Sequence, residues 1–94
     1  NKTKNQQKMN QVQSVDYSVK VVKRLLESKQ LVTSFKVQKF KKLEDAVKFY
    51  NWHLDHPFYD EGVVINRVII SKQEFVSGKL VSDKVIKKSP LNLL

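Results

Sequence analysis

Two stretches near the start of the chain alternate between apolar and polar residues, over residues 15–21 and 31–37. Period-two alternation that is rich in β-branched residues is typical of strands with one buried face. A three-residue loop at residues 27–29 would align the two apolar faces, pairing Val21 with Phe35 and Val19 with Val37. The pattern therefore predicts an antiparallel hairpin, with a helix over the first stretch as the competing assignment.

Apolar residues then recur at helical spacing, within about 60° of one direction when each residue advances about 100°. Glu44 and Asp45 suit the first turn of a helix, and Pro57 discourages continuation past His56. We therefore expect an amphipathic helix over residues 43–54. The apolar stripe consists of Leu43, Ala46, Val47, Tyr50 and Leu54.

The second half of the chain predicts two more strands. Residues 63–70 are almost continuously apolar, as expected of a strand that is central in a sheet. Residues 75–88 give a weaker strand signal that is interrupted at Ser77 and Gly78. The order ββαββ predicts an α+β domain with a four-stranded, mainly antiparallel sheet and one helix packed on one face.

The domain organisation follows from length and local composition. A chain of 94 residues has room for one domain. Residues 1–14 contain three lysines, four glutamines and three asparagines, so we expect a disordered basic arm there. The α+β domain then occupies residues 15–90, and residues 91–94 form an apolar tail.

Charge and compartment restrict the partners. There are 18 basic and 9 acidic residues, a formal net charge of +9, and the basic residues are lysines apart from Arg24 and Arg67. Lysine-dominated charge favours diffuse attraction to phosphate over recognition of base edges. The chain has no cysteine and no apolar run typical of a secretory signal or membrane span, so we expect a cytoplasmic protein without a membrane partner.

Basic residues concentrate on and after the predicted hairpin. A surface of this kind can follow a nucleic-acid backbone, whereas the alternative is a solvated lysine face that protects sheet edges from aggregation. No aromatic residue alternates with these lysines, so any contact is expected to be with the backbone. The predicted nucleic-acid-binding residues are Lys20, Arg24, Lys36, Lys39 and Lys41.

The predicted helix carries a second, aromatic face. Phe49, Trp52 and His56 lie opposite the apolar stripe, with His53 at its border. Tryptophan is enriched in interface hot spots, so these four residues predict a contact with a partner protein or a homodimer contact. In the alternative, Leu91, Leu93 and Leu94 fold over the face and bury it.

Signals for catalysis are weak. His53, Asp55 and His56 resemble a metal-ligand cluster, but their spacing fixes no third ligand. With Gly62 and Gly78 as its two glycines, the chain has neither a nucleophile elbow nor a phosphate-cradling loop. We therefore expect no catalytic residue, no metal and no cofactor, and keep a metal-dependent enzyme as a remote alternative.

Two functional hypotheses remain. In the first, this is a small, basic, non-enzymatic protein that associates with nucleic-acid backbone or a nucleoprotein without base specificity. In the second, it is a phage- or plasmid-encoded interaction module that inhibits a host nucleic-acid-processing enzyme, such as a CRISPR effector. The aromatic face would then anchor the host protein.

Overall fold

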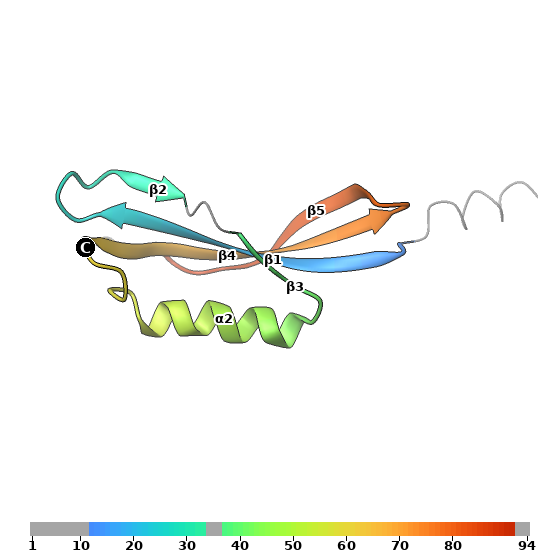
Figure 1. Ribbon diagram of the computed structural model, residues 1–94, viewed down its shortest axis with the longest axis horizontal. Coiled ribbons are helices and arrows are strands. Elements are labelled where there is room, and N and C mark those ends of the chain that lie inside the picture. Colours follow the sequence, from blue (N-terminus) through green and yellow to red (C-terminus); the bar gives the residue numbers. More distant parts are fainter. Residues whose placement is uncertain (1–11, 34–36, 92–94) are drawn as a thin grey trace, which may run out of the picture.

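The computed structural model describes residues 12–33 and 37–91, which form an α+β fold with one helix against an open antiparallel sheet of five strands (Figure 1). The sheet order is β2-β1-β4-β5, and β3 also pairs with β1. The predicted fold class is confirmed, but the strand count is five and not four. The elements are β1 (Ser14–Leu25), β2 (Leu31–Thr33), β3 (Gln38–Phe40), α2 (Leu43–Asp55), β4 (Val63–Val76) and β5 (Lys79–Lys88).

The extra strand arises because the predicted second strand is divided. β2 pairs Thr33 with Val22, whereas β3 pairs Gln38 with Val19, and these two registers differ by two residues. The predicted pairing of Val19 with Val37 is therefore wrong. The predicted partner of Val21, Phe35, lies outside the described residues.

The hairpin loop explains part of the register error. Leu25 and Gln30 close a four-residue loop, because the Leu25 amide donates to the Gln30 carbonyl at 2.8 Å. Lys29 ends the loop in the left-handed region with φ 61°, and its amide donates to the Leu25 carbonyl at 2.8 Å. The loop is thus one residue longer than the expected one, which moves each opposing residue by one position.

β4 is the central strand, as its apolar run predicts. It pairs with β1 from Val63 to Phe75 and with β5 from Ile69 to Val76. The interruption predicted at Ser77 and Gly78 is the two-residue turn between β4 and β5, where φ is 52° and 76°. Two positive φ values are what the tight turn of a twisted hairpin requires.

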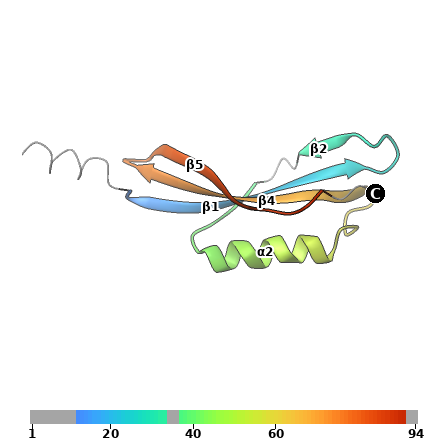
Figure 2. The ribbon, with the colours of Figure 1, turned by 180° about the vertical axis from the view of Figure 1, so that it is seen from behind.

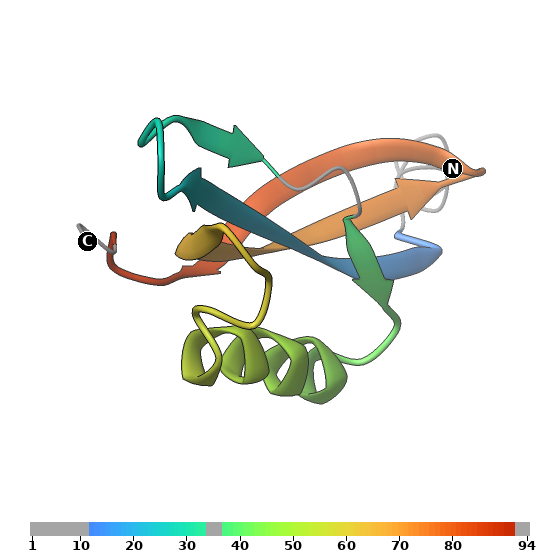
Figure 3. The same cartoon turned by 60° about the vertical axis from the view of Figure 1, so that its left-hand side comes forward.

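The core lies between α2 and one face of the sheet (Figure 3). Alternate residues of β1 and β4 point towards the helix, because successive side chains of a strand point to opposite faces. Figures 1 and 2 show that the helix lies along the half of the sheet that contains β2, and that the β4–β5 hairpin extends past it. The buried apolar residues of this core are Val19, Val21, Ala46, Tyr50, Ile65, Val68 and Ile70.

The apolar stripe of the helix is rotated from its predicted position. Ala46 and Tyr50 are buried as expected, but Leu43 and Leu54 are exposed. Phe49 instead packs against the core, with its ring 5.4 Å from that of Phe40 on β3. The contact with β3, which the sequence pattern did not predict as a separate strand, accounts for the rotation.

Candidate functional site

The side of the sheet that α2 leaves uncovered is called the open face here. The register places Ser18 opposite Lys39 on one neighbouring strand and opposite Ser71 on the other. Residues that face each other across strands share a side of the sheet, so the same register assigns the remaining members. The open face carries Asp16, Ser18, Lys20 and Val22 of β1, Val37 and Lys39 at β3, Arg67, Ile69, Ser71 and Gln73 of β4, and Asp83, Val85 and Lys88 of β5.

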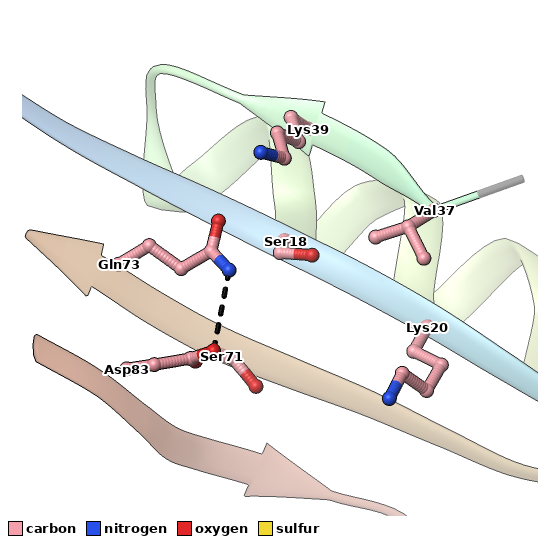
Figure 4. Close-up of a pocket in the computed structure, with 7 residues that line it drawn as sticks. All are labelled: Ser18, Lys20, Val37, Lys39, Ser71, Gln73 and Asp83. Atoms are coloured by element: carbon pink, nitrogen blue, oxygen red, sulfur yellow. Dashed lines mark hydrogen bonds between the residues drawn. The ribbon is translucent and has the colours of Figure 1, made fainter. Parts of the chain in front are cut away.

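A shallow hollow of about 280 Å³ lies on the open face. Lys20 and Lys39 extend from two different strands beside it (Figure 4). The Gln73 amide Nε2 donates a hydrogen bond to Asp83 Oδ2 at 3.3 Å. The hollow thus combines two ammonium groups and one carboxylate with neutral side chains, and it is lined by Ser18, Lys20, Val37, Lys39, Ser71, Gln73 and Asp83.

The acidic groups of the open face already have polar partners. Asp16 Oδ1 lies 2.6 Å from Lys41 Nζ, and Asp83 accepts the hydrogen bond from Gln73. Among the described residues, neither Lys20 nor Lys39 forms an ion pair. Lys39 Nζ lies 6.0 Å from the centre of the Phe75 ring. The open face therefore presents cations with few competing carboxylates.

The structure describes four of the five predicted nucleic-acid-binding residues. Lys20 and Lys39 share the open face, and Lys41 lies just after β3 in its ion pair with Asp16. Arg24 is tethered, because Nη1 donates to the Lys29 carbonyl at 3.1 Å and Nη2 to Asn66 Oδ1 at 3.3 Å. Lys36 lies outside the described residues.

The sequence interpretation missed two cations of the open face, Arg67 and Lys88. Arg67 pairs with Val22, and Lys88 pairs with Ile69, which itself lies opposite Lys20. Period-two arithmetic along the apolar run of β4 would have placed Arg67. The sequence pattern could not assign Lys88 to the open face, because the pairing of β5 with β4 contains register shifts that an alternating pattern does not reveal.

A second candidate surface lies where α2 ends. We call Trp52, His56 and Tyr59 the aromatic surface. Trp52 is 45% exposed and Tyr59 48%. The Trp52 and His56 rings stack at 4.3 Å with an interplanar angle of 17°, and the Tyr59 ring meets Trp52 edge-on at 5.2 Å. Exposed aromatic clusters of this kind are typical of interaction sites.

The structure divides the four residues of the predicted aromatic face. Trp52 and His56 are exposed, whereas Phe49 and His53 turn towards the sheet, and His53 is only 6% exposed. A carbonyl oxygen only accepts hydrogen bonds, so His53 Nδ1 donates to the Phe49 carbonyl at 2.9 Å. Tyr59 was missed because it lies in a loop, where helical spacing predicts nothing.

His56 has a structural role in addition to its exposure. Its ring Nδ1 donates to the Trp52 carbonyl at 2.8 Å, and its backbone amide donates to the same oxygen at 3.0 Å. The residue therefore ends the helix and satisfies a carbonyl that has no partner further along it. These contacts hold the imidazole in its stack on Trp52.

Lys23 lies at the edge of the aromatic surface. Its Nζ is 3.0 Å from Asp60 Oδ2 and 5.1 Å from the centre of the Tyr59 ring. Burial of the ammonium opposes its charge, but hydrogen bonds to Asp60 and Tyr59 outweigh that penalty and raise the pKa of Lys23 above its ordinary value of 10.5. The aromatic surface is thus in contact with a cationic side chain, Lys23, that strand β1 supplies.

The leucines predicted to cover the aromatic face of the helix lie mostly outside the described residues. Leu91 is 50% exposed, and Leu93 and Leu94 lie outside the described residues.

Among residues 12–33 and 37–91, no group of three or more histidine, cysteine, aspartate or glutamate side chains is arranged to hold a metal ion. No helix in that part of the chain has the length and apolar character needed to cross a membrane.

Comparison with known proteins found no matching family model, curated protein or solved structure. The chemistry of the open face and of the aromatic surface is therefore the basis for assigning a function.

Proposed function

We propose that this is a non-enzymatic protein that binds the phosphate backbone of nucleic acid, free or in a nucleoprotein, through the open face. The observation that carries the proposal is the convergence of Lys20, Lys39, Arg67 and Lys88 on the side of the sheet without a helix. Each comes from a different strand, so together they form a band of positive charge across the sheet.

The dimensions of this band suit a polymer. Neighbouring strands lie about 4.8 Å apart, so four strands span about 14 Å. Nucleic acid rises about 3.4 Å per nucleotide of a strand, so the band is comparable to about four nucleotides. Lysine and arginine contacts with phosphate position a protein on nucleic acid, whereas contacts with base edges provide sequence specificity. The open face is rich in lysine and arginine side chains, which are the groups that contact phosphate.

Binding of two labelled oligonucleotides of unrelated sequence, followed by fluorescence anisotropy, tests this proposal. With about four phosphate contacts, the slope of log affinity against log salt should be about −3, which is a loss of about 50- to 100-fold between 50 and 200 mM salt. Both sequences should bind equally well. Affinity that is independent of salt, or a strong preference for one sequence, would contradict backbone binding.

A second candidate function is favoured by the exposure of Trp52. Monomeric proteins seldom expose several neighbouring aromatic rings, and buried tryptophans dominate many protein interfaces. The aromatic surface therefore supports a protein-interaction module, such as a phage or plasmid protein that inhibits a host nucleic-acid-processing enzyme. If Trp52 serves an interface, Trp52→Ala should leave the midpoint of thermal unfolding nearly unchanged and weaken the partner complex by about 2 kcal/mol or more.

A further inference from the structure

The charge of the chain is unevenly distributed. Residues 43–62, which comprise α2 and the loop after it, contain five acidic residues and one lysine, a formal charge of −4 with neutral histidines. Since the whole chain carries +9, the other residues together carry +13. The helix layer is thus acidic, whereas the sheet that it covers is basic.

Part of this acidic charge lies beside the aromatic surface. Asp55 is the last residue of α2, and Asp60 and Glu61 follow Tyr59 in the loop. All three are exposed. The aromatic surface therefore has exposed rings and exposed carboxylates close together in the chain, an arrangement that suits a cationic ligand. Phosphate would be repelled by the same carboxylates, so this surface does not suit nucleic acid.

The contact of Lys23 shows that this chemistry can hold a cation. Its ammonium meets the Asp60 carboxylate at 3.0 Å and lies 5.1 Å from the centre of the Tyr59 ring. A carboxylate together with an aromatic face attracts a cation by both charge and the ring quadrupole. Trp52 offers a better ring for the same interaction, and Asp55 and Glu61 are exposed carboxylates close to it in sequence.

We infer that the aromatic surface is a docking site for a basic, arginine- or lysine-bearing segment of a partner protein. This inference rests on the second candidate function and adds the chemistry of the partner. A second copy that presented the same surface would bring like charges together, which disfavours a symmetric dimer. Basic segments are common in proteins that bind nucleic acid, so one nucleoprotein would offer ligands for both the open face and the aromatic surface.

Titration with fluorescein-labelled nona-arginine tests the inference. Trp52 is the only tryptophan of the chain, so its intrinsic fluorescence reports on the aromatic surface alone. Unlabelled nona-arginine should bind saturably and change the Trp52 emission, despite the net charge of +9 on the protein. Nona-glutamate should leave the Trp52 emission unchanged, because the cationic side chains that would bind this peptide lie on the open face.

A matched pair of variants separates local recognition from diffuse attraction. Asp55→Asn combined with Glu61→Gln should lower the affinity for nona-arginine at least about fivefold, measured by the anisotropy of the labelled peptide. Glu44→Gln combined with Asp45→Asn removes the same charge at the other end of the helix and should change affinity less than about twofold. Trp52→Ala should also weaken binding at least about fivefold while the thermal unfolding midpoint is retained.

Two results would overturn the inference: nona-arginine fails to bind, or the Glu44 and Asp45 variant loses as much affinity as the Asp55 and Glu61 variant. A special case of the first result is that nona-arginine does not bind, the protein self-associates at rising concentration, and Trp52→Ala abolishes that association. The occupant would then be a second copy, and the interaction module would survive without the basic partner. If Trp52→Ala changes neither peptide binding nor self-association, the second candidate function also loses its support.

Discussion

The two faces of the sheet differ in cover and in charge although neighbouring residues of the same strands supply both. In β1, Val19 has no exposed surface and packs under the helix, whereas Lys20 next to it is exposed on the open face. In β4, Ile70 is fully buried, whereas Ile69 beside it lies opposite Lys20 and Lys88. One helix can cover only one face of a sheet. Along each strand, the residues that face the helix therefore contribute to stability, and the residues between them are available for binding.

This division makes the effect of a substitution depend on its face. Substitutions under the helix should act on folding, through lost apolar contacts and residual cavities. Substitutions on the open face should act on binding and leave folding nearly unchanged.

The largest effect is expected at Tyr50, which is 5% exposed and packs in the core. Tyr50→Ala should lower the free energy of unfolding by about 3 kcal/mol, because a buried aromatic side chain is replaced by a cavity. Urea denaturation followed by circular dichroism measures the loss. Leu54→Ala is the control from the exposed side of the same helix and should cost less than about 1 kcal/mol. Similar losses in both variants would show that the helix faces are assigned wrongly.

A smaller effect is expected at Ser89, where the chain leaves β5. Ser89 is 2% exposed, and its Oγ accepts a hydrogen bond from the Val68 amide at 2.9 Å. Ser89→Ala leaves that buried amide without this acceptor and should cost about 1 to 2 kcal/mol in urea denaturation. Ser14→Ala, at an exposed position, should change stability by less than about 0.5 kcal/mol. Equal stability of the Ser89 and Ser14 variants would disprove the contribution of the hydrogen bond.

A pH-dependent effect is expected at Lys23. Its pKa is raised in the folded protein, since hydrogen bonds to Asp60 and Tyr59 outweigh the opposing effect of burial. The folded state therefore binds this proton more tightly than the unfolded state, and the resulting stabilisation is complete below pH 10.5. It is lost as the pH rises through the folded pKa. Lys23→Met should be less stable by under about 1 kcal/mol at neutral pH.

Denaturation at neutral and strongly alkaline pH checks this sign. The difference between wild-type protein and Lys23→Met should shrink as the pH rises above 10.5. A difference that stays constant over that range would contradict the role of the ammonium. A difference that grows would reverse the sign of the linkage.

The smallest effect on stability is expected on the open face. Lys20 and Lys39 are exposed and form no ion pair among the described residues. Lys20→Gln combined with Lys39→Gln should therefore shift the free energy of unfolding by less than about 0.5 kcal/mol. A loss of 2 kcal/mol or more would mean that these side chains serve the fold, and the contrast between the two faces would fail.

Much of the fold could be predicted from periodicity. The helix and the start of β4 lie where the sequence pattern indicated, whereas β4 continues to Val76, and Ser77 and Gly78 form a turn between two strands and not an interruption within one. The hairpin register could not be predicted, because it depends on the left-handed conformation of Lys29 and on the division between β2 and β3. No glycine or proline in the sequence marks either the conformation of Lys29 or the division between β2 and β3.

Less of the candidate site could be predicted. The sequence identified Lys20, Lys39 and Trp52, which are exposed in the structure. It could not assign Arg24 to its contacts with Lys29 and Asn66, because Asn66 is 42 residues away in the chain. Nor could it show that His53 turns inwards, since that depends on how far the helix rotates against β3. The placement of Arg24 and His53 depends on contacts between residues that are far apart in the sequence. Local sequence patterns do not reveal such contacts.

Whether the open face binds phosphate can be decided by the salt dependence of nucleic-acid affinity in two double variants. Lys20→Gln with Lys39→Gln removes two charges from the open face, and Lys42→Gln with Lys48→Gln removes two exposed charges from the helix cap and helix. The open-face variant should reduce the log-log slope by about 1.4 to 1.8, whereas the helix variant should change it by less than about 0.5. Equal changes in both slopes would contradict the claim that the open face binds the phosphate backbone.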